Sequence, residues 1–249
     1  MNTTLPVKTL VLVPSYNEES NLPRTLTSLL DVVTRDDVLV IDDGSSDRTS
    51  TIARQAGVNL LRNQRNIGRN SSVVRGMSWG LKRGYSLIIC VDADGQHPVK
   101  EIPRMVRRFC SSPSPDCIIM SRFLMITRLR TVPKVDALGI LVSSFLVSMS
   151  AGRHISDPTS GYIAFSPRAA QCLIQHVSVL RSIVSDNTWA MGQYPLFTKY
   201  GLYITELGTR YIPRRSGKRK MFSPSKRILF PLRLLRAFLT IRLTLATLP

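Results

Sequence analysis

Acidic residues are scarce in this sequence, and none follows Glu206. The 249 residues include 16 Asp and Glu against 34 Lys and Arg, so the formal net charge is +18 and the pI is about 10.6. Such a balance indicates an anionic partner, either nucleic acid or an anionic membrane surface. Aromatic residues make up only 7% of the chain, which is little for a protein that stacks bases. We therefore expect no nucleic-acid partner, and a basic nucleic-acid-binding protein remains a remote alternative.

Long apolar runs and metal-type cysteine spacing are also missing. The longest nearly uncharged stretch, residues 137–151, is shorter than the roughly 20 apolar residues that a membrane-spanning helix needs. The four cysteines, Cys90, Cys110, Cys117 and Cys172, lack the spacing of a zinc site, and we expect reduced thiols. Residues 1–10 have neither a charged segment nor a long apolar core, which predicts that no signal peptide is present.

Strand-like and helix-like segments alternate along the first part of the chain. We expect strands at residues 8–13, 37–41, 58–61 and 86–91, and helices at 19–30, 47–56 and 70–82. This alternation predicts an α/β fold with a mostly parallel sheet. Further along, helices are expected at 98–110, 135–151 and 167–176, and strands at 117–120, 161–165 and 203–207. The length suits one α/β domain, here residues 1–222, followed by a basic tail at 223–249.

Two carboxylates, Asp92 and Asp94, follow the apolar run at residues 86–91. The carboxyl end of a buried strand opens into the crevice where α/β sheets bind ligands. Hard divalent cations prefer oxygen ligands, and Mg²⁺ usually takes one or two carboxylates together with substrate phosphates. The pattern therefore predicts a cation that bridges the protein and a diphosphate. His97 is either a further ligand or a structural residue.

Polar segments also follow the first two expected strands. Pro-Ser-Tyr-Asn-Glu occupies positions 14–18, and Asp-Asp-Gly-Ser-Ser-Asp occupies positions 42–47. Acidic residues at such strand ends commonly bind ribose hydroxyls, and helix N-termini favour anions. Each segment alone fits a loop with a helix cap at Ser46 or Asp47, but three segments at one edge predict a nucleotide site. Gly68 would let the backbone approach a phosphate closely.

These motifs, in this order and spacing, resemble the family-2 glycosyltransferases of GT-A fold. The similarity includes Asn-x-Gly at 66–68 and Asp-Ala-Asp-x-Gln-His-Pro at 92–98. Ser121-Arg122, the Asp-Pro-Thr-Ser-Gly segment at 157–161 and the late basic segment are similar to the dolichyl- or polyprenyl-phosphate sugar transferases. The resemblance covers roughly residues 10–221. It implies a GT-A fold, in which helices flank a mostly parallel central sheet, followed by a basic amphipathic C-terminal helix.

The resemblance also implies a role for each matching residue. The nucleotide would be bound by Pro14, Tyr16, Glu18, Asp42, Asp43 and Asp92. Mg²⁺ or Mn²⁺ would be held by Asp92, Asp94 and Gln96. The acceptor phosphate would be bound by Ser121, Arg122, Lys134, Arg214 and Lys220, with Arg128 and Arg130 as alternatives to Lys134. The catalytic residues would be Asp94, Arg122 and Asp157, the last beside the reacting sugar. Two positions depart from the family pattern, which usually has Gly at Met120 and Ser at Arg219.

Charge dictates the expected mechanism. Breaking the sugar–diphosphate bond leaves negative charge on the nucleotide, and a bound cation stabilises it as a Lewis acid. A phosphate monoester acceptor is already largely ionised near neutral pH, so it needs positioning cations and no strong base. A direct in-line displacement would invert the anomeric centre. If the acceptor were instead a glycan or glycolipid hydroxyl, a base would be required, and Asp157 is the candidate.

The apolar but basic segment at residues 232–248 suggests where the protein acts. On a helical wheel one narrow side carries Arg233, Arg236, Thr240, Thr244 and Thr247, while Arg242 falls on the broad apolar side. Such a helix is typical of a membrane interface, and a core-packing or dimer helix is the alternative. We expect a peripheral protein on the cytoplasmic face of a membrane. Its substrates would be GDP-mannose or a UDP-sugar and a polyprenyl phosphate, and a small membrane-anchoring subunit is left open.

Overall fold

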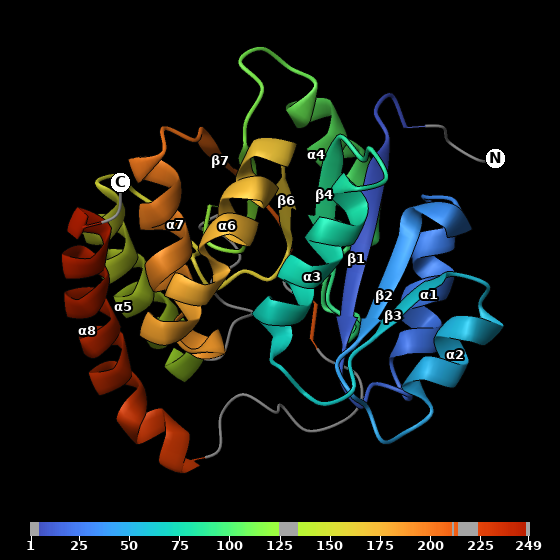
Figure 1. Ribbon diagram of the computed structural model, residues 1–249, viewed down its shortest axis with the longest axis horizontal. Helices are drawn as coiled ribbons and strands as arrows, with labels where there is room; N and C mark the ends of the chain where they lie inside the picture. Colours follow the sequence, from blue (N-terminus) through green and yellow to red (C-terminus); the bar gives the residue numbers. More distant parts are fainter. Residues whose placement is uncertain (1–4, 125–133, 211, 214–223, 248–249) are drawn as a thin grey trace.

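A seven-stranded sheet forms the centre of the computed structural model, which describes residues 5–124, 134–210, 212–213 and 224–247 (Figure 1). The strands are β1 (Thr9–Ser15), β2 (Val38–Asp42), β3 (Asn59–Arg62), β4 (Leu87–Cys90), β5 (Cys117–Ser121), β6 (Ile163–Phe165) and β7 (Ile204–Gly208). Their order is β3-β2-β1-β4-β6-β5-β7. Only β6 pairs antiparallel, with β4 and β5, so the expected mostly parallel sheet is confirmed.

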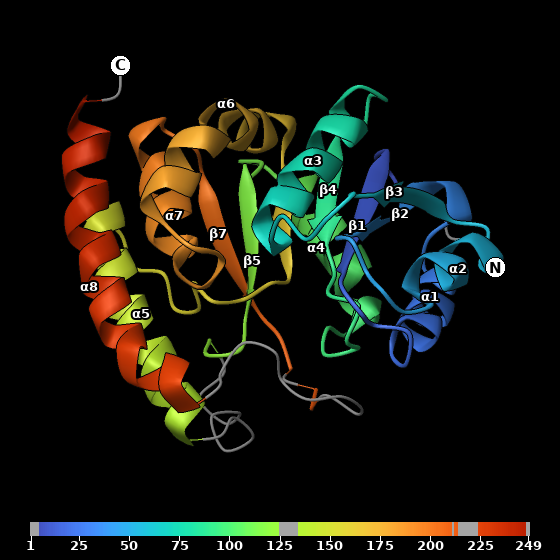
Figure 2. The ribbon, with the colours of Figure 1, turned by 60° about the horizontal axis from the view of Figure 1, so that its bottom comes forward.

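Helices cover both faces of the sheet because its strands bury alternate residues on opposite sides. In β1, Val11 and Val13 pack with α1 (Leu22–Leu30), α2 (Thr49–Gln55) and α4 (Ile102–Phe109). Leu10 and Leu12 belong to the core on the other face. The helices of that face are α3 (Arg69–Leu81), α5 (Lys134–Ala151), α6 (Pro167–Ile183), α7 (Ala190–Lys199) and α8 (Pro224–Thr247). Figure 2 shows α5 and α8 side by side at one end of this layer.

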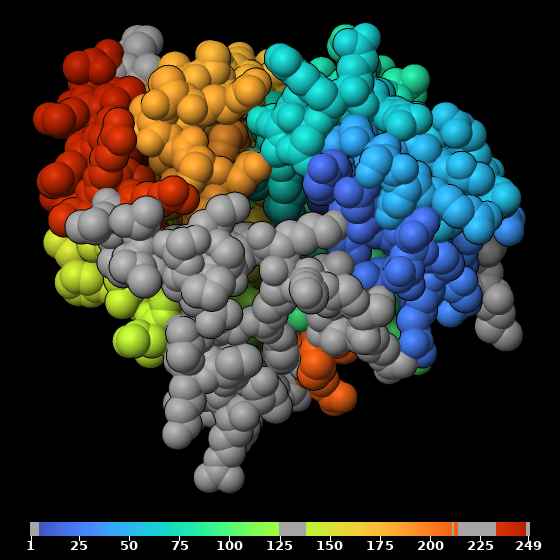
Figure 3. Space-filling model, turned by 90° about the horizontal axis from the view of Figure 1, so that it is seen from below, coloured from blue at the N-terminus to red at the C-terminus, as the bar shows by residue number. Residues whose placement is uncertain are grey.

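The order of the strands places a ligand crevice at β1 and β4. The chain leaves β1 for β2 on one side and later enters β4 on the other, with all three strands parallel. In open α/β sheets ligands bind outside the carboxyl ends of the strands at such a switch point. In Figure 1 these ends point downward, and Figure 3 views the molecule from that side. The polar segments that follow β1, β2 and β4 therefore share one edge, as the sequence predicts.

The observed helices differ in several places from the predicted ones. The helix expected at 19–30 begins at Leu22, where Pro23 occupies the first turn that proline favours. The helix expected at 167–176 continues to Ile183, and α7 was not predicted from the sequence, since it contains Gly192 and Pro195. Helix α8 starts at Pro224 and packs into the same core as α6 and α7. The division into a domain at 1–222 and a tail at 223–249 stays a prediction.

Candidate active site

The segment after β1 is fastened to the segment after β2. Asn17 adopts a left-handed conformation with φ of 50°, which asparagine tolerates better than most residues. Its backbone N–H donates to the Ser45 hydroxyl at 2.9 Å. Among the predicted nucleotide ligands here, Pro14 and Glu18 are buried, while Tyr16 remains 38% exposed. Tyr16 is therefore the member of this group whose side chain is open to a ligand.

Asp42 is fully buried and organises the loop that follows β2. Its carboxylate accepts hydrogen bonds from the Ser45 N–H at 2.8 Å and from the Ser50 hydroxyl, and the Arg62 guanidinium lies 3.6 Å away. Through these contacts Asp42 stabilises the loop between β2 and α2. Its contribution to the nucleotide pocket stays a prediction.

Asp43 holds the loop between β3 and α3. Its Oδ1 atom accepts from the Asn63 side chain at 2.8 Å and from the Ile67 N–H at 2.9 Å, and Oδ2 accepts from the Gly68 N–H at 3.0 Å. The side chain is only 3% exposed. Asp43 thus fixes the loop that leads into α3, while direct contact with a nucleotide stays a prediction.

The N-terminus of α3 is occupied by a carboxylate of the chain itself. The Asp186 side chain accepts from the backbone N–H groups of Arg69 at 3.0 Å and Asn70 at 3.1 Å. Gly68, with φ of +94°, caps this helix, and any side chain there would collide with Asp186. The expectation that Gly68 brings the backbone to a phosphate needs correction, because in this structure the anion at that helix end is Asp186. Asp186 gave no signal in the sequence, because it lies 117 residues from Arg69.

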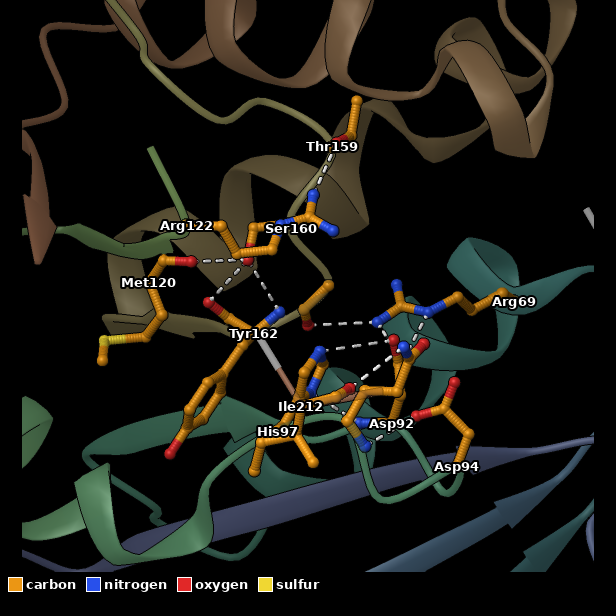
Figure 4. Close-up of polar contacts among 12 residues, drawn as sticks. Arg69, Asp92, Asp94, His97, Met120, Arg122, Thr159, Ser160, Tyr162 and Ile212 are labelled. Carbon is orange, nitrogen blue, oxygen red and sulfur yellow. Dashed lines mark hydrogen bonds and ion pairs between the residues drawn. The ribbon is translucent and has the colours of Figure 1, made fainter. Parts of the chain in front are cut away.

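Asp92 is paired with Arg69 (Figure 4). The Asp92 Oδ1 atom accepts from Arg69 Nη2 at 2.6 Å and from Arg69 Nε at 2.9 Å, and Arg69 Nη2 also donates to the Gly161 carbonyl at 3.1 Å. A Cβ atom at position 161 would lie 2.5 Å from the Asp92 carboxylate and 2.8 Å from Arg69 Nη2. The pair therefore explains why the Asp-Pro-Thr-Ser-Gly segment ends in glycine. Arg69 itself was missed in the sequence, where it is one of many arginines.

Charge and burial act on this pair in opposite directions. Burial disfavours the ionised form of Asp92, but Arg69, with His97 and Arg122, outweighs it and lowers the pKa of Asp92. Burial likewise opposes ionisation of Arg69, yet Asp92 raises the pKa of that guanidinium. Both groups are therefore charged near neutral pH.

His97 has a structural role beneath this pair. Its Nδ1 atom accepts a hydrogen bond from the Asp92 backbone N–H at 3.0 Å, and its ring stacks on Tyr162 with 4.9 Å between centroids. Burial lowers the pKa of His97 to about 4, with the neighbouring Asp92 opposing this shift. The imidazole is therefore neutral at physiological pH. Of the two alternatives left by the sequence, these contacts favour the structural one.

The buried neutral imidazole predicts a pH-dependent stability. An unfolded histidine titrates near 6.5, so from there down to about pH 4 the unfolded chain binds a proton that folded His97 does not. The free energy of unfolding should fall by about 3 kcal/mol across this window, since one pKa unit corresponds to about 1.4 kcal/mol. Urea unfolding of the metal-free protein at several pH values measures it. His97→Asn keeps an acceptor for the Asp92 N–H and should flatten the slope, and an unchanged slope would contradict the assignment.

The turn after β4 suits a hard divalent cation. Asp92, Asp94 and Gln96 offer only oxygen atoms toward such an ion, and the Asp94 carboxylate accepts from the Gln96 N–H at 3.1 Å. Figure 4 shows the Asp94 carboxylate beside that of Asp92. No cluster of three or more His, Cys, Asp or Glu that could hold a metal occurs among the described residues. A cation held by the side chains of Asp92, Asp94 and Gln96 would leave positions for phosphate oxygens, as Mg²⁺ sites commonly do.

Arg122 and Asp157 form the opposite wall of the site. Arg122 donates to Asp157 from Nε at 2.7 Å, from Nη2 at 2.8 Å and from its backbone N–H at 3.1 Å, and Nη2 also reaches the Thr159 hydroxyl at 2.8 Å. The Asp157 side chain is fully buried, whereas that of Arg122 is 23% exposed. The arrangement presents a cation to the crevice and keeps the carboxylate beneath it. The prediction that Asp157 lies beside the reacting sugar stays a prediction.

Ser121 belongs to a hydrogen-bond network under this wall. Its hydroxyl lies 2.6 Å from the Ser156 hydroxyl, which donates to the Glu206 carboxylate at 2.8 Å. Glu206 also accepts from the Ser156 N–H at 3.0 Å. Ser121 is fully buried, so in this structure it supports the turn that carries Asp157 and is not open to a phosphate. The sequence did not reveal Glu206, because its partners lie about 50 residues away.

Most of the remaining predicted acceptor residues lie outside the residues that the structure describes. Lys134 begins α5, but its side chain is outside the described residues. Arg214 and Lys220, the alternatives Arg128 and Arg130, and the unusual Arg219 lie outside them entirely. The other departure, Met120, is fully buried in the core with Ile118 and Tyr162, so it does not project into the crevice.

The sequence is similar to that of a known family and of several characterised proteins. The family description glycosyl transferase family 2 matches residues 10–173. An undecaprenyl-phosphate mannosyltransferase of Micrococcus luteus is 28% identical over 226 residues, covering 86% of this chain and 88% of the relative. A polyprenol monophosphomannose synthase of Mycolicibacterium smegmatis is 30% identical over 164 residues, covering 64% and 61% of the two chains.

A solved structure shares the fold. Glucosyl-3-phosphoglycerate synthase from Mycobacterium tuberculosis, in complex with Mn²⁺, uridine diphosphate and phosphoglyceric acid, superposes with a TM-score of 0.65. The match covers 98% of this chain and 80% of that one at 16% identity. At such low identity the likeness supports the fold alone.

Proposed function

The chain belongs to glycosyltransferase family 2 and has the GT-A fold, and from this we propose that it transfers a sugar from a nucleotide-diphosphate donor to a polyprenyl phosphate. The donor would lie at the switch point between β1 and β4, against Tyr16 and the Asp92 turn. The acceptor phosphate would lie against Arg122. The names of the two sequence relatives support this substrate class.

The pairing of Arg122 with Asp157 carries the proposal. A hydroxyl acceptor needs a base within hydrogen-bond reach, and Asp157 is fully buried with both oxygens accepting from Arg122. An ionised phosphate needs a cation instead, and the Arg122 side chain, which is 23% exposed, is a cation on this side of the site. Geometry therefore favours a phosphate acceptor over a glycan or glycolipid hydroxyl.

The residues divide the chemistry between two sides of the crevice. We infer that Asp94 and Gln96, with Asp92 beside them, hold Mg²⁺ or Mn²⁺, which when bound stabilises the charge that develops on the leaving nucleotide. Arg69 keeps the Asp92 carboxylate ionised and fixed. Arg122 positions a phosphate oxygen for in-line attack, which would invert the anomeric centre. Phosphates bind arginine well because its donors match their oxygens.

A direct assay tests the proposal. Purified protein is incubated with radiolabelled GDP-mannose, UDP-glucose or UDP-N-acetylglucosamine, Mn²⁺ and a polyprenyl phosphate in detergent. We expect label from at least one donor in an organic-soluble product that mild acid cleaves. The unphosphorylated polyprenol is the matched control and should accept nothing. No label in the polyprenyl phosphate, together with label on the polyprenol or on a glycan supplied in a parallel reaction, would favour the hydroxyl-acceptor alternative and overturn the proposal.

The protein would act at a membrane because its acceptor is a lipid. No helix in the described part of the chain combines the length and apolarity needed to cross a bilayer. We propose peripheral attachment at the cytoplasmic face, with α8 in contact with the lipid.

A further inference from the structure

Helix α5 carries large apolar residues on its outward side and buries two serines, together with Ile140, Val147 and Ala151, on its inward side. Ser143 and Ser144 face the protein interior, where the Ser144 hydroxyl donates to the Ile155 carbonyl at 2.6 Å. The outward side is a stripe of large apolar residues, Leu138, Leu141, Val142, Phe145 and Met149, with exposed fractions of 65%, 54%, 39%, 64% and 48%. A helix at a water-facing surface normally turns this side inward.

Helix α8 extends the same surface. Leu234, Ala237, Phe238 and Ile241 face the core, whereas Leu235, Leu239 and Leu243 face outward with exposed fractions of 48%, 56% and 73%. The broad apolar face predicted from the sequence is therefore divided, half of it packing against the protein. Arg242 lies at one border of the outward leucine stripe and Arg236 at the other, at the spacing of 3.6 residues per turn. Both arginines are exposed, so neither interrupts the stripe.

The helices that carry the two stripes are neighbours. Helices α5 and α8 pack together at one end of the molecule (Figures 1 and 2). Together they hold eight of the eleven exposed large apolar side chains in the described part of the chain. Scattered apolar residues are ordinary on a protein surface, whereas a contiguous group marks an interaction site.

We propose that the outward sides of α5 and α8 form one lipid-facing surface that lies in the interface of an anionic bilayer. The positive charge around this surface indicates that an anionic lipid bilayer covers it. The exposed arginines Arg236 and Arg242 border the apolar stripe, Arg233 is exposed on the same helix beyond Arg236, and no acidic residue follows Glu206 anywhere in the sequence. A second copy of the chain would bring these arginines toward one another, whereas anionic headgroups neutralise them while acyl chains cover the leucines.

The position of this surface deepens the proposed function, on which this step rests. In Figure 1 both helices begin on the side to which the carboxyl ends of the parallel strands point. Arg122 follows β5 at that same edge, and α5 is the next helix in the described part of the chain. A protein seated on the bilayer through α5 and α8 would thus hold Arg122 near the headgroup layer, where the phosphate of a lipid acceptor is located.

Vesicle flotation tests the surface. The probes are phosphatidylcholine vesicles with and without 30% phosphatidylglycerol. Phe145→Glu in α5 and Leu239→Glu in α8 should each weaken binding about tenfold or more, since a buried large apolar side chain contributes at least about 1.5 kcal/mol. Gln175→Glu adds the same charge to an exposed position of α6 and should bind as the unmodified protein does. Unchanged flotation of Phe145→Glu, with circular dichroism confirming its fold, would overturn the proposal.

The arginines test the charge argument separately. Replacing Arg233, Arg236 and Arg242 together by glutamine should weaken binding to the anionic vesicles about 100-fold, or roughly fivefold for each residue. Binding to the neutral vesicles should not change. Light scattering on the unmodified protein tests the competing occupant, and a dimer that Phe145→Glu dissociates would assign the surface to a second copy instead.

Transfer assays separate this inference from the proposed function. A short, water-soluble prenyl phosphate needs no bilayer, so Phe145→Glu should use it as the unmodified protein does. Transfer to a long polyprenyl phosphate in vesicles should fall with flotation. If the unmodified protein binds anionic vesicles but transfers sugar to neither acceptor, the proposed function fails and the lipid-facing surface stands. If transfer to the vesicle acceptor survives in variants that no longer float, the surface has no part in the reaction and its proposed role fails.

Discussion

Asp94→Asn is expected to lower kcat/KM for sugar transfer by at least about 1,000-fold and to abolish Mn²⁺-dependent binding of a nucleoside diphosphate. The cation contributes several kcal/mol to the stabilisation of the leaving group, and each tenfold in rate corresponds to about 1.4 kcal/mol. An asparagine keeps the shape of the side chain but removes its charge. The partly exposed position should leave the free energy of unfolding within about 0.5 kcal/mol of the original.

Calorimetry with GDP or UDP, in Mn²⁺ and in a chelator, measures the binding effect. Asp36→Asn, which removes an exposed carboxylate elsewhere, is the matched control and should retain both binding and transfer. Asp92→Asn should behave differently from Asp94→Asn, because it also leaves Arg69 without its ion-pair partner and so destabilises the fold. If Asp94→Asn still binds the diphosphate more tightly in Mn²⁺ than in chelator, and as tightly as the original protein does in Mn²⁺, the metal assignment is wrong.

The sequence was sufficient for the sheet and for one edge of the site because both depend on local patterns. Short apolar runs predict strands, and polar motifs directly after β1, β2 and β4 must meet once those strands lie parallel. Helix α7 was not predicted because Gly192 and Pro195 are unfavourable inside a helix. The helix forms nevertheless, because burial in the core outweighs such local preferences. The pattern of apolar and polar residues within a short segment therefore predicts which strand is followed by a functional motif.

Contacts between distant segments could not be predicted in the same way. Asp186 at the start of α3, Arg69 on Asp92 and Glu206 under Ser156 each join parts of the chain that only the fold brings together. Helix α8 shows the same limit. The spacing of its apolar residues in the sequence predicts a broad apolar side, but it does not predict which of those residues pack against the rest of the protein. On the acceptor side, the buried Ser121 and its link through Ser156 to Glu206 depend on such contacts, so the sequence did not reveal them.

Arg122→Met is expected to destabilise the protein by about 3–5 kcal/mol, because it leaves the fully buried Asp157 carboxylate without its partner. It should also abolish transfer. A loss of transfer in this variant alone would say little, since a damaged fold loses activity for structural reasons. The informative comparison adds Asp157→Asn, which removes the buried charge.

The double variant Arg122→Met, Asp157→Asn should regain about 2 kcal/mol or more relative to Arg122→Met, because no unpaired charge then remains buried. Donor binding in Mn²⁺ should return with the fold, as measured by calorimetry beside urea unfolding. Transfer to a polyprenyl phosphate should not return, because the cation that positions the phosphate is still missing. If the double variant regains transfer, Arg122 serves only to neutralise Asp157, and the acceptor phosphate must bind elsewhere. Lost transfer in a stable protein that still binds its donor would place Arg122 at the acceptor phosphate and Asp157 beneath it as the positioning carboxylate.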